Sequence, residues 1–309
     1  MDRFRQLADI VRNWGRWGSG DFRGTLNFIT EETLRDAAAC VTDGRLFSLG
    51  LRFDKNGPQR NDARFNPMLF PTQLFTPLSE AHPTMCFSDD VVTMPLQCAT
   101  QWDSLAHVHY DDMLYNGHSA SKSFGVHCTS CNGIENLAEA GIMSRGVLLD
   151  IPRLKGVSRL GPDDPITPDD LNQACEKFGI SIKSGDVVLV RTGHLQVFTL
   201  NGDVHALHAS EPGLTPECAE WLHDKSVAAV GADTVGVEVV PLAGFGETIP
   251  FAFHLLALRD MGCPLGELFD LEALAEDCAR DGRYMFLFSA PPLAITGGFG
   301  SPVNPLVLK

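Results

Sequence analysis

Two kinds of segment alternate along the chain from residue 134 onward. The runs GVLLDI and GDVVLVRTG are nearly continuous in apolar residues, which is typical of strands covered on both faces. Segments of helical character lie between these runs. The pattern predicts helices at 134–140, 167–178 and 215–225, and strands at 147–151, 186–191 and 227–230. The alternation indicates an α/β protein.

Local capping signals support two of these helices. Thr167 precedes PDDLNQAC, so acidic side chains would occupy the first turn, where the positive end of the helix dipole stabilises them. Thr215 precedes PECAEW, which places proline at the first helical position. We therefore expect the two helices to begin at these threonines.

The two ends of the chain have weaker patterns. Residues 1–85 mix short apolar stretches with turn-rich segments such as KNGPQRNDARFNP, which predicts loops, short strands and one helix at 30–42. Helices are predicted at 251–261 and 271–280, followed by a strand-like stretch, YMFLFSAPPLAI. The final GGFGSPVNPLVLK predicts a loop that leads into a terminal strand. Without a repeat or a linker, one domain over residues 1–309 is expected.

Composition narrows the class of protein. The 309 residues carry a net charge of −15, which opposes nonspecific attraction to nucleic acid or to an anionic membrane. No stretch of 18 apolar residues and no leader-like segment occurs, so we expect a cytoplasmic protein. The nine cysteines are scattered and are expected to be reduced; the Cys128–Cys131 spacing lacks a second CxxC. A small-molecule substrate is the partner that these properties favour.

The densest polar cluster is QCATQWDSLAHVHYDD, residues 97–112. It includes Asp103 and His107, whose spacing allows them to converge on a cation or to act as an acid/base pair. The alternative interpretation is a polar surface turn with solvated histidines. The residues of the cluster alone leave both interpretations open.

The stretch TQWDSLAH resembles the signature HxGTHxDxPxH of the cyclase and kynurenine-formamidase family. Asp103 falls on its metal-binding aspartate, His107 on its last histidine, and Gln97 and Gln101 on its two earlier histidines. The resemblance continues along the chain, in order, through WGSGDFRGTLN (17–27), RGVLLD (145–150), GDVVLVRTG (185–193), EPGL (211–214), GADTVGVE (231–238) and HLLALRDMGCPLGE (254–267).

This resemblance implies a mixed β-sheet or barrel-like β core flanked by helices, in a homodimer or homotetramer. Residues 1–85 would be an extension packed on the core or used in dimer contacts. The family implies a zinc or manganese ion whose water attacks an amide, lactam, lactone or ester carbonyl. Carried over by position, Asp103, His254 and Glu267 would bind the metal, with Gln101 as a further ligand. His107 would be the acid/base. The catalytic residues would then be Asp103, His107, His254 and Glu267.

The two glutamines depart from the family pattern. An amide oxygen is a weaker zinc ligand than imidazole, so a set of one histidine, two carboxylates and an amide favours manganese or magnesium. Three states stay open: a weakly held metal, a metal-free acid/base site for cyclisation, isomerisation or dehydration, and a non-catalytic binding protein. The residues expected to contact substrate are Gln97, Gln101, Trp102, Tyr115 and Asn116.

Overall fold

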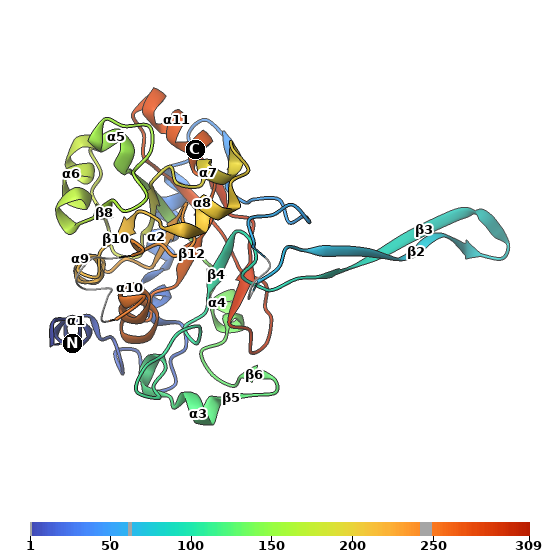
Figure 1. The fold of residues 1–309 in the computed structure, drawn as a ribbon, viewed down its shortest axis with the longest axis horizontal. Coiled ribbons are helices and arrows are strands. Elements are labelled where there is room, and N and C mark those ends of the chain that lie inside the picture. The colour runs from blue at the N-terminus through green and yellow to red at the C-terminus, as the bar shows by residue number, and fades with distance from the viewer. Residues whose placement is uncertain (1, 61–63, 242–248) are drawn as a thin grey trace.

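A mixed nine-stranded sheet forms the centre of the molecule. The structure is a computed structural model that describes residues 2–60, 64–241 and 249–309 (Figure 1). The order of the strands across the sheet is β1 (Leu46–Ser48), β15 (Leu306–Leu308), β13 (Met285–Ser289), β7 (Met143–Asp150), β9 (Val187–Arg191), β11 (Ala229–Ala232), β12 (Leu265–Glu267), β4 (Gln101–Asp103) and β14 (Gly300–Pro302). The four strands β7, β9, β11 and β12 are parallel, and those at both sides pair antiparallel. The predicted mixed α/β architecture is confirmed.

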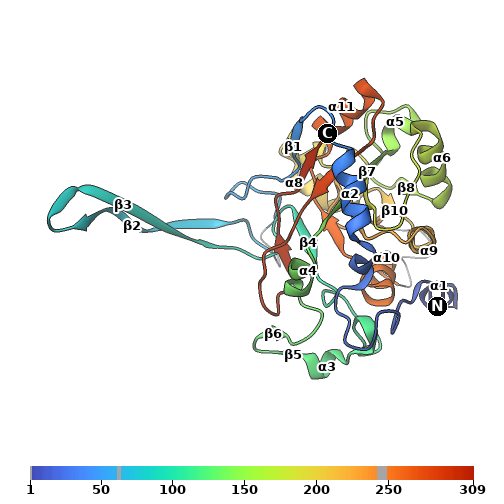
Figure 2. The same ribbon diagram turned by 180° about the vertical axis from the view of Figure 1, so that it is seen from behind.

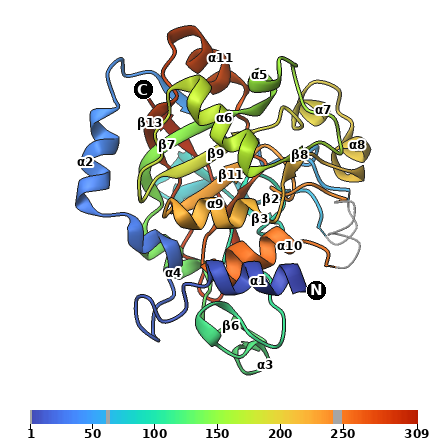
Figure 3. The ribbon, with the colours of Figure 1, turned by 90° about the vertical axis from the view of Figure 1, so that its left-hand side faces the viewer.

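Helices cover the parallel strands. In Figure 3, α6 and α9 lie in front of β7, β9 and β11. The helices are α1 (Asp2–Val11), η1 (Gly24–Phe28), α2 (Glu31–Ala39), η2 (Tyr115–Gly117), α3 (Ala120–Ser123), α4 (Ile134–Ala140), α5 (Ile151–Lys155), α6 (Pro168–Phe178), α7 (Gln196–Thr199), α8 (Val204–Ala209), α9 (Cys218–Asp224), α10 (Ala252–His254), η3 (Leu255–Met261) and α11 (Glu272–Asp281). Strands β7 and β9 are buried almost throughout, as their apolar runs predict. No helix among the described residues is long and apolar enough to cross a membrane.

Most predicted elements are present, with shifted ends. Thr167 caps α6 through a reciprocal pair of contacts with Asp170. Helix α9 begins at Cys218, three residues after Thr215, because the amides of Cys218 and Ala219 donate to the carbonyls of Thr215 and Pro216, so the chain first makes i→i+3 turns. Just before them, β8 (Pro165–Ile166) pairs with β10 (Gly213–Leu214). The predicted helix 251–261 divides into α10 and the π-helix η3.

The expectation of loops and short strands in residues 1–85 is wrong in two places. The prediction lacks helix α1, although four of its apolar residues recur with helical spacing and are buried: Phe4, Leu7, Ala8 and Val11. Strands β2 (Met68–Ser79) and β3 (His82–Thr93) form a hairpin of twelve residues per strand that projects far from the body (Figures 1 and 2). A second, minor hairpin joins β5 (Phe124–Gly125) to β6 (Cys128–Thr129).

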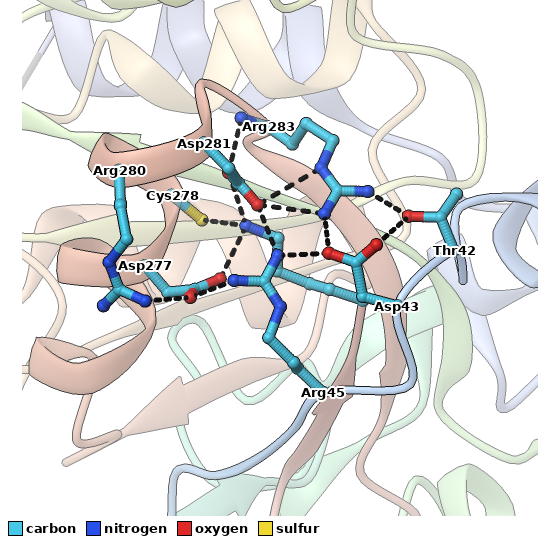
Figure 4. Close-up of polar contacts among 9 residues, drawn as sticks. Thr42, Asp43, Arg45, Asp277, Cys278, Arg280, Asp281 and Arg283 are labelled. Atoms are coloured by element: carbon cyan, nitrogen blue, oxygen red, sulfur yellow. Dashed lines mark hydrogen bonds and ion pairs between the residues drawn. The ribbon is translucent and has the colours of Figure 1, made fainter.

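An ion-pair network ties the segment before β1 to helix α11 and to Lys309. Arg45 and Arg283 both contact Asp43 and Asp281 (Figure 4). The Lys309 amine lies 3.0 Å from Asp281 and is almost fully buried. These contacts fix β1 and β15 at the far edge of the sheet, opposite the edge that holds β4 and β12.

Candidate active site

The pairing of β4 with β12 brings three polar side chains to one face of the sheet. Gln101 lies directly opposite Glu267 in the antiparallel register, and its amide nitrogen donates to the Glu267 carboxylate. Asp103 lies two residues along β4 and therefore points to the same face. The Gln101 amide nitrogen is 3.5 Å from the Asp103 carboxylate. All three side chains are buried.

His254 completes this cluster from the end of α10. Its Nε2 lies 3.2 Å from a Glu267 oxygen and 3.8 Å from an Asp103 oxygen. Its Nδ1 contacts Glu238 at 2.7 Å, and the same Glu238 oxygen accepts the His254 backbone amide at 2.9 Å. Glu238 therefore fixes both the ring orientation and the nitrogen that faces the cluster.

Burial and close charges shift the proton affinities in the cluster. Burial, together with the nearby Glu267 carboxylate, raises the pKa of Asp103 well above its ordinary value. Burial alone would lower the pKa of His254, but hydrogen bonds to Glu238 and Glu267 raise it well above the ordinary histidine value. These groups act as one coupled unit that shares protons.

Ligand atoms of Asp103, His254 and Glu267 all lie within 4.8 Å of one another. Asp103 Oδ2 is buried without a hydrogen-bond partner, which is costly, and a divalent cation between these residues would satisfy it. Gln101 Oε1 is also unpartnered, but the amide nitrogen of this side chain faces the carboxylates, so its oxygen would reach such a cation only after the amide rotates. One imidazole nitrogen and several carboxylate oxygens can serve as ligands of such a cation.

His107 connects this cluster to solvent. Its Nε2 lies 3.9 Å from Asp103 Oδ1, and the residue also lines a cavity of about 400 Å³. Burial lowers the pKa of His107 to about 4, so the imidazole is neutral near pH 7. The lining residues of this cavity, here called the mouth, are Arg64, Leu96, Gln97, Ala106, His107, His109, Phe124, Cys128, Gly298 and Phe299.

Gln97 and Trp102 lie apart from the cluster. Gln97 lines the mouth, and among the described residues its side chain has no hydrogen bond to Asp103 or Glu267. Trp102 points to the opposite face of β4 from its two neighbours, packs edge-on against Phe269 and Phe288, and donates to the Ala290 carbonyl. The tryptophan is therefore a core residue, and the expected substrate contact is corrected.

Tyr115 and Asn116 hold the glycine-rich segment 15–21. The Tyr115 hydroxyl donates to Asp21 at 2.9 Å, and its ring packs against Gly262. Asn116 accepts from the Gly15 amide and donates to the Gly18 carbonyl. Both residues therefore have a structural role in the fold, and the substrate contact expected of them stays a prediction.

Sequence reasoning did not place Glu238 in the site, although the residue closes the motif GADTVGVE. A carboxylate and a histidine sixteen residues apart follow no helix or strand period, so only the fold brings the two together. The aromatic walls of the mouth were also missed, and Phe124 and Phe299 form an edge-to-face pair there.

The fold and the cluster define an α/β enzyme class in which a buried carboxylate–histidine site at a sheet edge can hold a divalent ion. Comparison with known proteins gives the family. Residues 54–239, more than half of the chain, match the family described as "Putative cyclase". The chain therefore belongs to the cyclase family, and it is an enzyme of the cyclase and hydrolase type.

Individual relatives agree with this assignment. A solved structure described as a novel cyclase is 36% identical, covers 98% of this chain and 99% of its own, and superposes with a TM-score of 0.87. A "predicted metal-dependent hydrolase" from Bacillus stearothermophilus shares the fold at 17% identity, with a TM-score of 0.53 over 85% of this chain and 98% of its own.

A curated relative is the isatin hydrolase of Roseibium aggregatum, which is 32% identical over 157 residues. That match covers 49% of this chain and 55% of the relative, so the chain is aligned with only about half of the relative's length. The relative is named for the hydrolysis of isatin.

Proposed function

We propose that this protein hydrolyses the C–N or C–O bond of a small cyclic or acyl substrate, of the lactam, lactone, amide or ester class. The observation that carries the proposal is the convergence of Asp103, His254 and Glu267 within 4.8 Å, with one Asp103 oxygen buried and unpartnered. The similarity to isatin hydrolase favours a cyclic amide within this class.

Asp103, His254, Glu267 and Gln101 would hold a divalent ion. Such an ion supplies Lewis-acid polarisation of a carbonyl and acidification of water. The protein's own contribution is to hold these side chains in fixed positions and to exclude bulk water from them. Glu238 orients the imidazole of His254, and the strand register holds Glu267 opposite Gln101.

His107 would move the proton. The residue lies between the mouth and the carboxylates, and its lowered pKa leaves the ring free to accept a proton near pH 7. The imidazolium formed in this way can donate the same proton to the departing nitrogen or oxygen. Gln97, on the wall of the mouth, offers an amide N–H to a substrate carbonyl.

A second candidate function is metal-free acid/base chemistry, such as cyclisation, isomerisation or dehydration. The raised pKa of Asp103 favours this candidate, because a carboxyl group that keeps its proton beside Glu267 can serve as an acid. In that case Gln101 would bind a substrate oxygen through its amide.

Turnover with and without metal separates the two candidates. The purified protein would be dialysed against a chelator and assayed with isatin, other lactams, lactones and aryl esters, before and after addition of manganese, magnesium or zinc. Hydrolysis that appears only with metal supports the first candidate. His107→Ala should lower that rate about 10²–10⁴-fold while leaving metal content unchanged. Loss of metal in this variant would show that His107 is a ligand instead.

A further inference from the structure

The side chains that line the mouth differ in kind from those of the buried cluster. Phe124 packs edge to face against Phe299, with ring centroids 5.1 Å apart, and the ring of His109 packs edge-on against Phe124 at 5.5 Å. Among the described residues no aspartate or glutamate lines this cavity, and Arg64 is the one lining side chain with a permanent charge. The mouth therefore combines an aromatic surface with a single positive charge.

Arg64 has no carboxylate partner in the part of the chain that the structure describes. Its side chain makes one hydrogen bond there, from Nη1 to the Gln97 carbonyl at 3.3 Å. Every other buried or half-buried arginine of the described residues pairs with a carboxylate, as Arg145 and Arg191 do. A guanidinium carries five N–H donors, so most of the donors of Arg64 are available to a ligand in the mouth.

Arg64 also lies close to the reactive part of the site. Arg64 and His107 line the same cavity of about 400 Å³, a size that holds small ligands, so one small molecule can contact both. Burial dominates the pKa values of the buried groups, because it raises that of Asp103 and lowers that of His107 to about 4. The positive charge of Arg64 acts on both groups and lowers both pKa values, which agrees with this closeness.

We propose that Arg64 binds a carboxylate of the substrate, so that the enzyme acts on small acids: lactams, lactones, amides or esters that carry a carboxylate apart from the bond that is broken. This inference rests on the proposed hydrolytic function and names the substrate class within it. A carboxylate matches a single guanidinium, which offers two parallel N–H donors to its two oxygens. The apolar part of the substrate packs on Phe124 and Phe299, and its reacting carbonyl faces His107.

The charge within the mouth decides which ligands bind there, despite the overall charge of the protein. The net charge of −15 by itself disfavours an acidic ligand. Screening at physiological salt weakens interactions between exposed charges that are more than about 8 Å apart, so the lining side chains dominate. In a partly enclosed, apolar cavity the attraction of Arg64 for an anion is also stronger than on an open surface. A cationic substrate, by contrast, meets Arg64 and no carboxylate at the mouth.

Substrates matched in shape but not in charge test the proposal in the wild-type protein. Isatins with a carboxylate at each position of the benzene ring are compared with isatins that carry a carboxamide at the same position. For at least one position, kcat/KM for the carboxylate should exceed that for the carboxamide at least about tenfold. This ratio should fall as salt is added. Equal values at every position, or a preference for the carboxamides, would overturn the proposal.

Variants assign the preference to Arg64. Arg64→Gln should lower the carboxylate-to-carboxamide ratio of kcat/KM at least about tenfold, the loss expected for hydrogen bonds to a charged group. Arg64→Lys keeps the charge but not the parallel donors, so it should retain part of the ratio. The matched control is Arg35→Gln, which removes the same charge from a side chain 72% exposed on α2 and should leave the ratio unchanged. An equal fall in Arg64→Gln and Arg35→Gln would contradict the assignment.

Binding of benzoate separates this inference from the hydrolytic function. Calorimetry on the protein dialysed against a chelator gives its affinity for benzoate, benzamide and phenyl phosphate. Benzoate should bind at least about tenfold tighter than benzamide, phenyl phosphate should bind no tighter than benzoate, and Arg64→Gln should abolish the preference for benzoate. Melting curves check that the variants are folded, and the comparisons on the wild type need no variant.

The outcomes of the two experiments are distinct. Benzoate and benzamide affinities that are equal in the wild type, or a benzoate affinity that Arg64→Gln retains, would overturn the carboxylate site. Absence of turnover in both isatin series, together with benzoate binding that depends on Arg64, would refute the hydrolytic function for this substrate class and support the carboxylate site.

Discussion

Replacing Glu238 by glutamine tests whether this carboxylate acts through His254. One Glu238 oxygen accepts from both His254 Nδ1 at 2.7 Å and the His254 amide at 2.9 Å, and the other accepts the Phe253 amide at 3.2 Å. Glutamine has the same shape but supplies only one accepting oxygen. The NH₂ group of the glutamine would therefore face an N–H of His254 or Phe253, and two donors cannot form a hydrogen bond with each other.

The expected cost has two parts. A buried donor without an acceptor lowers the free energy of unfolding by about 1–3 kcal/mol. The neutral amide also releases the ring of His254 from its fixed orientation, and loss of such a supporting group lowers metal affinity about 10–100-fold. The affinity can be measured by competition with a chelating dye for manganese, and the unfolding free energy by urea titration.

Glu211→Gln is the matched control. Glu211 is also buried and accepts the Val235 amide at 2.6 Å, but it makes no hydrogen bond to His254. Burial raises the pKa of Glu211 well above its ordinary value, so a neutral amide changes its charge state little. Manganese affinity should stay within about threefold of wild type. Wild-type affinity in Glu238→Gln, or an equal loss in both variants, would refute the positioning role.

Three further substitutions test other parts of the molecule. Gln101→His supplies an imidazole nitrogen beside Glu267 and should tighten zinc binding at least about tenfold, measured by chelator competition. Asp103→Asn should reduce metal-dependent turnover at least about a thousandfold, yet leave the melting temperature of the metal-free protein equal or higher, because a neutral amide can never place a second negative charge beside Glu267 in this buried site. Asp233→Ala should lower the free energy of unfolding by about 3–5 kcal/mol, measured by urea titration, since Asp233 accepts three buried donors from Thr192 and Gly193. Unchanged zinc affinity in Gln101→His, unchanged turnover in Asp103→Asn, or an unchanged free energy of unfolding in Asp233→Ala would contradict the corresponding contact.

The sequence predicts the parallel centre of the fold well because its signals there are local. The continuous apolar runs of β7 and β9 and the threonine cap of α6 depend on neighbours a few residues away. Apolar residues in α1 also recur with helical spacing, so this helix too has a local signal. The turn-rich segments that follow α1 instead led to a prediction of loops and short strands for this part of the chain. In the β2–β3 hairpin, by contrast, neither strand buries a face against the body of the chain. Its sequence therefore lacks the alternation of apolar and polar residues that would predict a strand.

The candidate site was predicted through resemblance and refined by geometry. The convergence of Asp103, His254 and Glu267 matches the expectation, although their roles stay predictions. A three-residue strand is too short to show a period of two, so the sequence could not separate Gln101, which faces the cluster, from Trp102, which faces the core. The contact of Glu238 with His254 depends on the fold alone.

The separation between the buried cluster and the mouth has a consequence for how this enzyme can diversify. The reactive side chains stand on two short strands and a helix end inside the core, where a change of volume or charge disturbs packing. Much of the mouth is built from loop positions, such as those around Gln97, His109 and Phe299. Mutational drift can therefore alter which molecules enter while the chemistry is inherited unchanged, so relatives with the same buried residues need not share a substrate.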